Sequence, residues 1–159
     1  MEKMTYPQYL AEQKKAFDDL PIFFAFNHTQ FKEEMEKRGL TEDDTDKIYR
    51  LPGDHGGFYL RADAPKILAY FSADDPLENL MKDPAFAEDA FYYEMCNHEY
   101  GINPQGSWDV CSCFGHCEYG YDKGGKEYLE KMGFPPETID AYYAARRRYF
   151  KDAEEKEWF

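Results

Sequence analysis

The clearest pattern of apolar and polar positions lies between residues 84 and 98. Apolar side chains recur there every three or four residues, which predicts a helix that begins at Pro84 and stops before Gly101. Turn residues follow at 103–106, and residues 107–114 have the composition of a strand. The stripe facing the core would consist of Ala87, Ala90, Phe91, Met95 and His98.

The rest of the chain shows the same two periodicities in shorter segments. Helical spacing predicts helices at 6–19, 28–38, 64–71, 126–132 and 135–156, with Asn27 as the cap of the second. Asp74 or Asp75 would open a further short helix that carries Leu77, Leu80 and Met81. Short aromatic or β-branched runs predict strands at 22–26, 47–51 and 57–61, the last two joined by a glycine-rich connection. Together these elements predict an α+β fold. It would have three or four short strands in an antiparallel sheet packed against helices, and a long C-terminal helix.

The amino-acid composition indicates which class of protein this chain belongs to. The 159 residues suit a single domain, 1–159. Aromatic residues make up 18%, enough for a packed core, and 32 acids against 19 Lys plus Arg give a formal charge of −13. No apolar run reaches the length of a membrane span, and the N-terminus lacks a secretory signal, so we expect a cytosolic protein.

The negative charge determines which kinds of partner the chain attracts or repels. It repels nucleic acid and anionic membranes, so long-range attraction is toward a protein with a basic surface, such as a nucleic-acid-binding enzyme. Residues 33–46 hold seven acids against two bases, and residues 74–94 hold seven against one. A solvated face is the simpler interpretation. The alternative is a partner-binding surface formed by Glu33, Glu34, Asp43, Asp44, Asp46, Asp74, Asp75 and Glu78.

All four cysteines lie within residues 96–117, close to two histidines. These side chains are the candidates for a metal site: Cys96, His98, Cys111, Cys113, His116 and Cys117. Zinc knuckles usually have a two-residue gap inside each ligand pair, whereas Cys111 and Cys113 are separated by one residue and the pairing of Cys96 with His98 is undefined. We therefore predict reduced, buried cysteines with no metal and no cofactor, and a zinc-stabilised domain remains an alternative. Catalysis by a cysteine with His98 or His116 requires a proximity that the spacing does not impose.

His98 and Glu99 stand where the predicted helix ends. One interpretation is a hydrogen-bonded corner that fixes the angle between the helix and the next element. The other is a small enzyme or ligand-binding protein whose site lies at residues 97–100, with His98 and Glu99 as acid and base. The motifs of phosphate loops, metalloproteases, kinases and hydrolases are missing, which favours a protein that is not an enzyme.

Five short segments carry a resemblance to a known family: Phe23-Phe24-Ala25-Phe26, Gln30-Phe31, Gly56-Gly57-Phe58, Asn97-His98-Glu99-Tyr100 and Cys113-Phe114-Gly115. With them the chain resembles a family of small proteins of unknown function from Gram-positive and gut bacteria, their phages and mobile elements. The resemblance implies a single cytosolic domain of mixed helix and strand. Combined with the charge, it suggests an interaction module, a phage or mobile-element inhibitor of a host defence nuclease that acts like an anti-CRISPR protein.

Overall fold

The computed structural model describes residues 2–53, 56–116 and 125–159. These residues fall into two compact units. Unit 1 consists of residues 1–11 and 75–159, and unit 2 of residues 12–74. Helix α1 (Tyr6–Asp18) contributes residues to both. The single domain expected from chain length stays a prediction, and each unit is described by itself.

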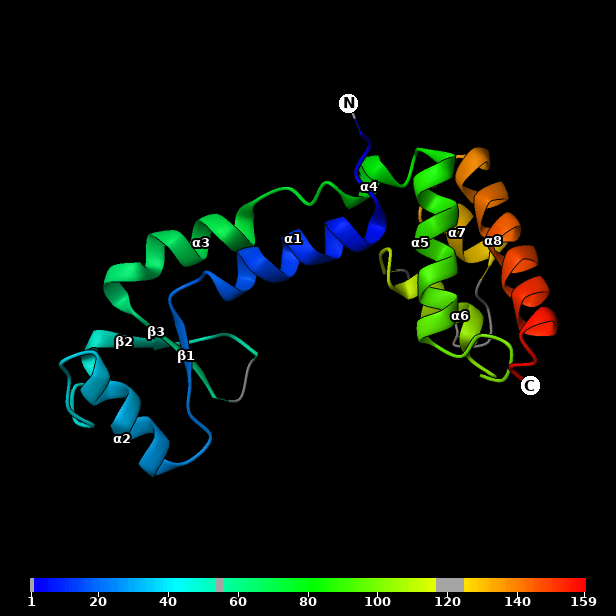
Figure 1. Ribbon diagram of the computed structural model, residues 1–159. Helices are drawn as coiled ribbons and strands as arrows, with labels where there is room; N and C mark the ends of the chain where they lie inside the picture. The colour runs from blue at the N-terminus through cyan, green and yellow to red at the C-terminus, as the bar shows by residue number, and fades with distance from the viewer. Residues whose placement is uncertain (1, 54–55, 117–124) are drawn as a thin grey trace. The chain divides into compact units, whose positions relative to one another are not determined.

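Unit 1 is helical in its described part (Figure 1). Helices α5 and α8, drawn in green and in orange to red, run side by side. Of the stripe expected from the sequence, Ala87, Ala90, Phe91 and Met95 are buried, whereas His98 at its end is about one-third exposed. The Phe91 ring is fully buried and packs edge-on against Phe114 and Tyr142, with centroid distances of 4.9 and 5.2 Å. After α1, its helices are α4 (Leu77–Leu80), α5 (Pro84–Asn97), α6 (Gly106–Ser112), α7 (Lys126–Lys131) and α8 (Pro136–Glu155).

Unit 2 holds the sheet. Its antiparallel strands follow the order β1-β3-β2, and the central strand pairs Phe58 with Phe23 on one side and with Arg50 on the other. Phe23, Met35 and Ile48 form a small core. The elements after α1 are β1 (Ile22–Phe24), α2 (His28–Lys37), β2 (Ile48–Arg50), β3 (Gly57–Leu60) and α3 (Ala64–Ser72), with 3-10 turns at Thr45–Lys47 and Arg61–Asp63. The α+β prediction is confirmed.

The predicted strand at 107–114 is wrong. Gly106–Ser112 forms helix α6, so the described strands all belong to unit 2. The physical reason lies in the spacing of the buried positions, because Gly106 and Val110 are four residues apart and lie on one face of the helix. The aromatic and β-branched composition suggested a strand, whereas burial against the neighbouring helices selected the helix.

Asn27 caps helix α2 as its position in the sequence suggested. Its Oδ1 accepts a hydrogen bond of 2.8 Å from the Gln30 amide. We expect Asn27→Ala to destabilise α2 by about 1 kcal/mol, which makes its amides exchange about 5-fold faster in native-state hydrogen exchange. Asp63 is the matched control, since it occupies the same position at α3 without a capping bond. Equal effects of the two substitutions would contradict this assignment.

Candidate functional site

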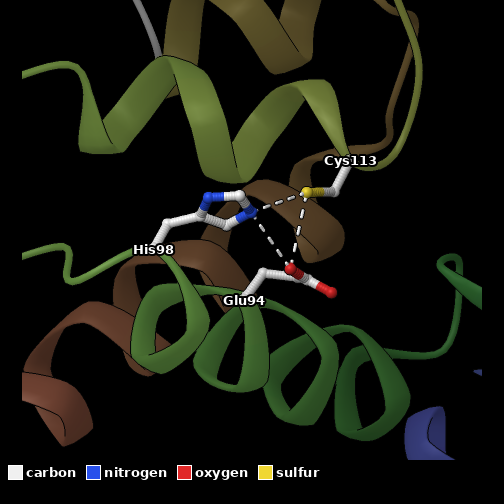
Figure 2. A group of neighbouring side chains, drawn as sticks. All are labelled: Glu94, His98 and Cys113. Carbon is white, nitrogen blue, oxygen red and sulfur yellow. Dashed lines mark hydrogen bonds and ion pairs between the residues drawn. The ribbon is translucent and has the colours of Figure 1, made fainter.

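Three side chains of unit 1 converge on one point (Figure 2). Glu94 and His98 are four residues apart on α5 and at its C-cap, so their side chains share one face of the helix. Cys113 is the C-cap of α6. The turn between the two helices reverses the chain and brings the thiol over the end of α5.

The donor atoms of this cluster are nearly equidistant. His98 Nε2 lies 3.3 Å from Glu94 Oε2 and 3.4 Å from Cys113 Sγ, and the sulfur lies 3.5 Å from the same carboxylate oxygen. One atom of each side chain therefore points to a common centre. Among the residues that the structure describes, this is the group of three donors close enough together to hold a metal ion.

Neighbouring side chains hold the cluster in place. Glu94 is only 6% exposed, and its second oxygen, Oε1, accepts a bond of 2.7 Å from the Tyr6 hydroxyl of α1. The amide of Asn103 donates to the His98 carbonyl at 3.1 Å and to Asp109 Oδ2 at 2.7 Å, which ties the turn to both helices. Bonds from outside the cluster thus hold the Glu94 carboxylate and the backbone at His98.

The electrostatics of the cluster keep the thiol protonated. Burial, together with the negative charges of Glu94 and Asp109, raises the pKa of Cys113 to about 12. Burial and the bond to Glu94 likewise raise the pKa of Tyr6, so its hydroxyl remains a donor to the carboxylate. A protonated thiol is a poor nucleophile.

The geometry also differs from a catalytic Cys-His-acid triad. In such a triad the acid binds the ring nitrogen that does not face the nucleophile, and thereby orients the imidazole. Here Glu94 and Cys113 both approach Nε2 of His98. Three donors around one centre are the arrangement of a metal site.

The structure brings together two of the six cysteine and histidine candidates, His98 and Cys113. Cys96 and His116 are exposed and stand apart from the cluster. Cys111 is buried elsewhere, where its sulfur accepts a bond of 3.3 Å from the Gly125 amide. Cys117 lies outside the described residues.

The sequence reasoning missed Glu94 as a donor. The available signal was its position one helical turn before His98, which places an acid and an imidazole on the same face.

Glu99 takes a different direction from His98. It adopts a positive φ of 50° at the end of α5, and its side chain is exposed. It lines a pocket of about 270 Å³ with Cys96, Trp158 and Phe159, among others. His98 is not among the residues that line this pocket. An acid-base pair of His98 with Glu99 stays a prediction.

The acidic candidates divide between the two units. Glu34 is bonded to Lys37 and Arg38 at 2.8 and 2.9 Å, and these bonds lower the pKa of its carboxyl. Asp44 bonds the backbone amide of Thr41 at 2.8 Å. Asp75 accepts from the Tyr9 hydroxyl and from the Leu77 amide, which opens α4. The exposed members are Glu33, Asp43, Asp46 and Asp74 in unit 2 and Glu78 in unit 1, together with Asp75.

The fold and this cluster define an α+β protein with three converging side-chain donors at one helix end. The sequence model of a family of unknown function (DUF7659) matches residues 5–118, more than half of the chain and all three donors. The chain belongs to this family. No curated protein and no solved structure matches it.

The helices bear on the expectation that no segment spans a membrane. In the described ranges no helix is both long enough and apolar enough to cross a bilayer. The cytosolic location and the mobile-element setting stay predictions.

Proposed function

We propose that the chain is a metal-binding domain in which Glu94, His98 and Cys113 hold a zinc ion. The observation that carries the proposal is the set of three distances between their donor atoms, 3.3, 3.4 and 3.5 Å. Tetrahedral zinc with ordinary bond lengths separates a nitrogen and an oxygen ligand by about 3.4 Å. It separates sulfur from either by about 3.6 Å. The three side chains therefore stand close to the positions that zinc requires.

The charges of the proposed ligands also favour a zinc ion. A carboxylate and a thiolate together neutralise a divalent cation, so the loaded site places no net charge between the helices. The negative groups that disfavour a free thiolate at Cys113, Glu94 and Asp109, also favour a nearby cation. Within the described part of the chain, three donors leave one of zinc's four positions for water or another ligand.

Metal analysis tests the proposal directly. Protein purified without chelator is expected to carry about one zinc per chain. Replacement of zinc by Co²⁺ should produce the absorption of a thiolate-cobalt bond, because Cys113 would be a ligand. A protein that holds well under one metal ion per chain, and that gains no cobalt absorption on titration, would refute the site.

Tyr6 is the positioning residue of this site through its bond to Glu94. We expect Tyr6→Phe to weaken zinc affinity by about 10- to 100-fold, the usual effect of losing a partner of a metal ligand. Tyr92→Phe is the matched control, since it removes a tyrosine bond to the carboxylate of Asp152, outside the cluster. Competition with a fluorescent zinc chelator measures the zinc affinity of both variants. Unchanged affinity in Tyr6→Phe would contradict the role of Tyr6.

A second candidate function is an acidic interaction module that binds the basic surface of another protein, such as a host defence nuclease. Three exposed acids of unit 2 support it, because Glu33, Asp43 and Asp46 have no ion-pair partner among the described residues. Such side chains can occupy a groove that otherwise binds phosphates.

A cleavage assay with an RNA-guided nuclease tests this second function. The chain is expected to inhibit cleavage, and the triple substitution of Glu33, Asp43 and Asp46 by lysine should abolish the inhibition. The control replaces Glu137, Asp140 and Glu154 by lysine, since these are exposed acids of unit 1 that lie outside the candidate surface. No inhibition, or inhibition that the triple substitution leaves intact, excludes this function.

A further inference from the structure

Unit 2 contains a surface pocket of about 480 Å³, unrelated to the cluster on unit 1. Its lining comes from the segment before α2, from α2 itself and from strands β2 and β3. Its volume lies within the range of about 300 to 1,000 Å³ that small-molecule sites occupy.

Three of the sequence motifs meet at this pocket. The Phe26 amide donates to Gln30 Oε1 at 2.9 Å, and the Ala25 amide donates to the Gly56 carbonyl at 2.8 Å. A Cβ atom at Gly56, where φ is +125°, would stand 2.8 Å from the Phe26 ring. The glycine thus leaves room for this ring beside the backbone. The backbone at Phe26 is held by these bonds, and 72% of the residue is exposed.

Aromatic rings supply most of the apolar lining. Phe31 and Phe58 pack against each other with centroids 5.3 Å apart, and both line the pocket together with Phe26. Phe26 in turn stacks on Phe24 at 6.4 Å with nearly parallel planes. Ring faces held in fixed positions favour a planar ligand, which stacks without ordering new side chains.

One positive charge in the lining is not neutralised by the described residues. Arg50 lies on β2 beside the Phe58 ring, 5.6 Å from its centroid, and no carboxylate of a described residue lies within ion-pair distance of it. Nε2 of His28, by contrast, lies 2.6 Å from Oε2 of Glu42. The Arg50 guanidinium is thus available to an anionic ligand in the pocket.

We propose that this pocket binds a small anion attached to a planar ring. The ring would stack on the phenylalanines, and the guanidinium of Arg50 would bind the carboxylate or phosphate through two parallel hydrogen bonds. Nucleoside monophosphates and aromatic carboxylates both have this chemistry.

Amide chemical shifts measured by NMR test the proposal with five probes. Adenosine monophosphate and indole-3-acetate carry a ring and an anion, adenosine and indole carry only a ring, and inorganic phosphate only an anion. We expect at least one of the first two to shift amides lining the pocket, near 25–31, 48–50 and 58, and to bind at least about 10-fold more tightly than its uncharged counterpart or phosphate. Which of the two binds distinguishes phosphate from carboxylate recognition.

Substitutions localise the interaction. Arg50→Gln should weaken binding about 10-fold or more. Arg61→Gln should not, since Arg61 also lies over an aromatic ring, Tyr49 at 4.6 Å, but lines a different pocket. Phe26→Ala should weaken binding, whereas Phe71→Ala, exposed on the same unit but outside this lining, should not. No shifts with either ring-bearing anion, equal binding of the uncharged rings, or equal losses in Arg50→Gln and Arg61→Gln would overturn the proposal.

Discussion

Replacing His98 by alanine is expected to weaken zinc binding by at least about 100-fold, more than the loss of a residue that only supports a ligand. The imidazole supplies the nitrogen that stands 3.3 and 3.4 Å from the other two donors. Its side chain is about one-third exposed, so truncation leaves no buried cavity and the fold should persist. His28→Ala is the control because His28 is exposed and lies on unit 2.

The same experiment extends to the cysteines. Cys113→Ser should remove the thiolate-cobalt absorption, because oxygen replaces the only sulfur of the cluster. Cys96→Ser should leave this absorption unchanged, since Cys96 stands outside the cluster. Chelator competition gives the affinities and circular dichroism confirms the fold. Wild-type affinity in His98→Ala, or equal losses in the two cysteine variants, would show that zinc binds elsewhere.

Phe91→Ala is expected to lower the free energy of unfolding of unit 1 by about 3 to 5 kcal/mol. The side chain is fully buried, and its ring contacts join α5 to Phe114 and to Tyr142 of α8. Truncation removes apolar area and both edge-on ring pairs, and it leaves a cavity that close-packed helices fill only in part.

Urea denaturation followed by tryptophan fluorescence measures this loss. Both tryptophans of the chain, Trp108 and Trp158, belong to unit 1, so the signal reports on that unit. Ile102→Ala is the control, since Ile102 is 61% exposed and its truncation should cost under about 0.5 kcal/mol. A similar small change for Phe91→Ala would mean that α5 and α8 are not packed through this ring.

Local signals in the sequence predicted most of the elements. The spacing of Ala87, Ala90, Phe91 and Met95 indicated α5 and its buried face, because a helix repeats every 3.6 residues whatever surrounds it. Asn27 indicated the start of α2, because a cap acts within three residues of its own position. The prediction failed at 107–114, where composition suggested a strand and packing against neighbouring helices produced α6.

By itself, the sequence determined the charge, the aromatic content and the helical stripe of α5. The meeting of Glu94 with His98 became clear only in the structure. Only the tertiary structure decided which of the three described cysteines joins them. Cys113 lies beside Glu94 and His98 because the turn after α5 reverses the chain and α6 follows it. Cys96 is only two residues from His98 along the chain, yet it is exposed and lies outside the cluster. Distance along the chain does not determine such a meeting, because it depends on how the helices pack around the buried side chains.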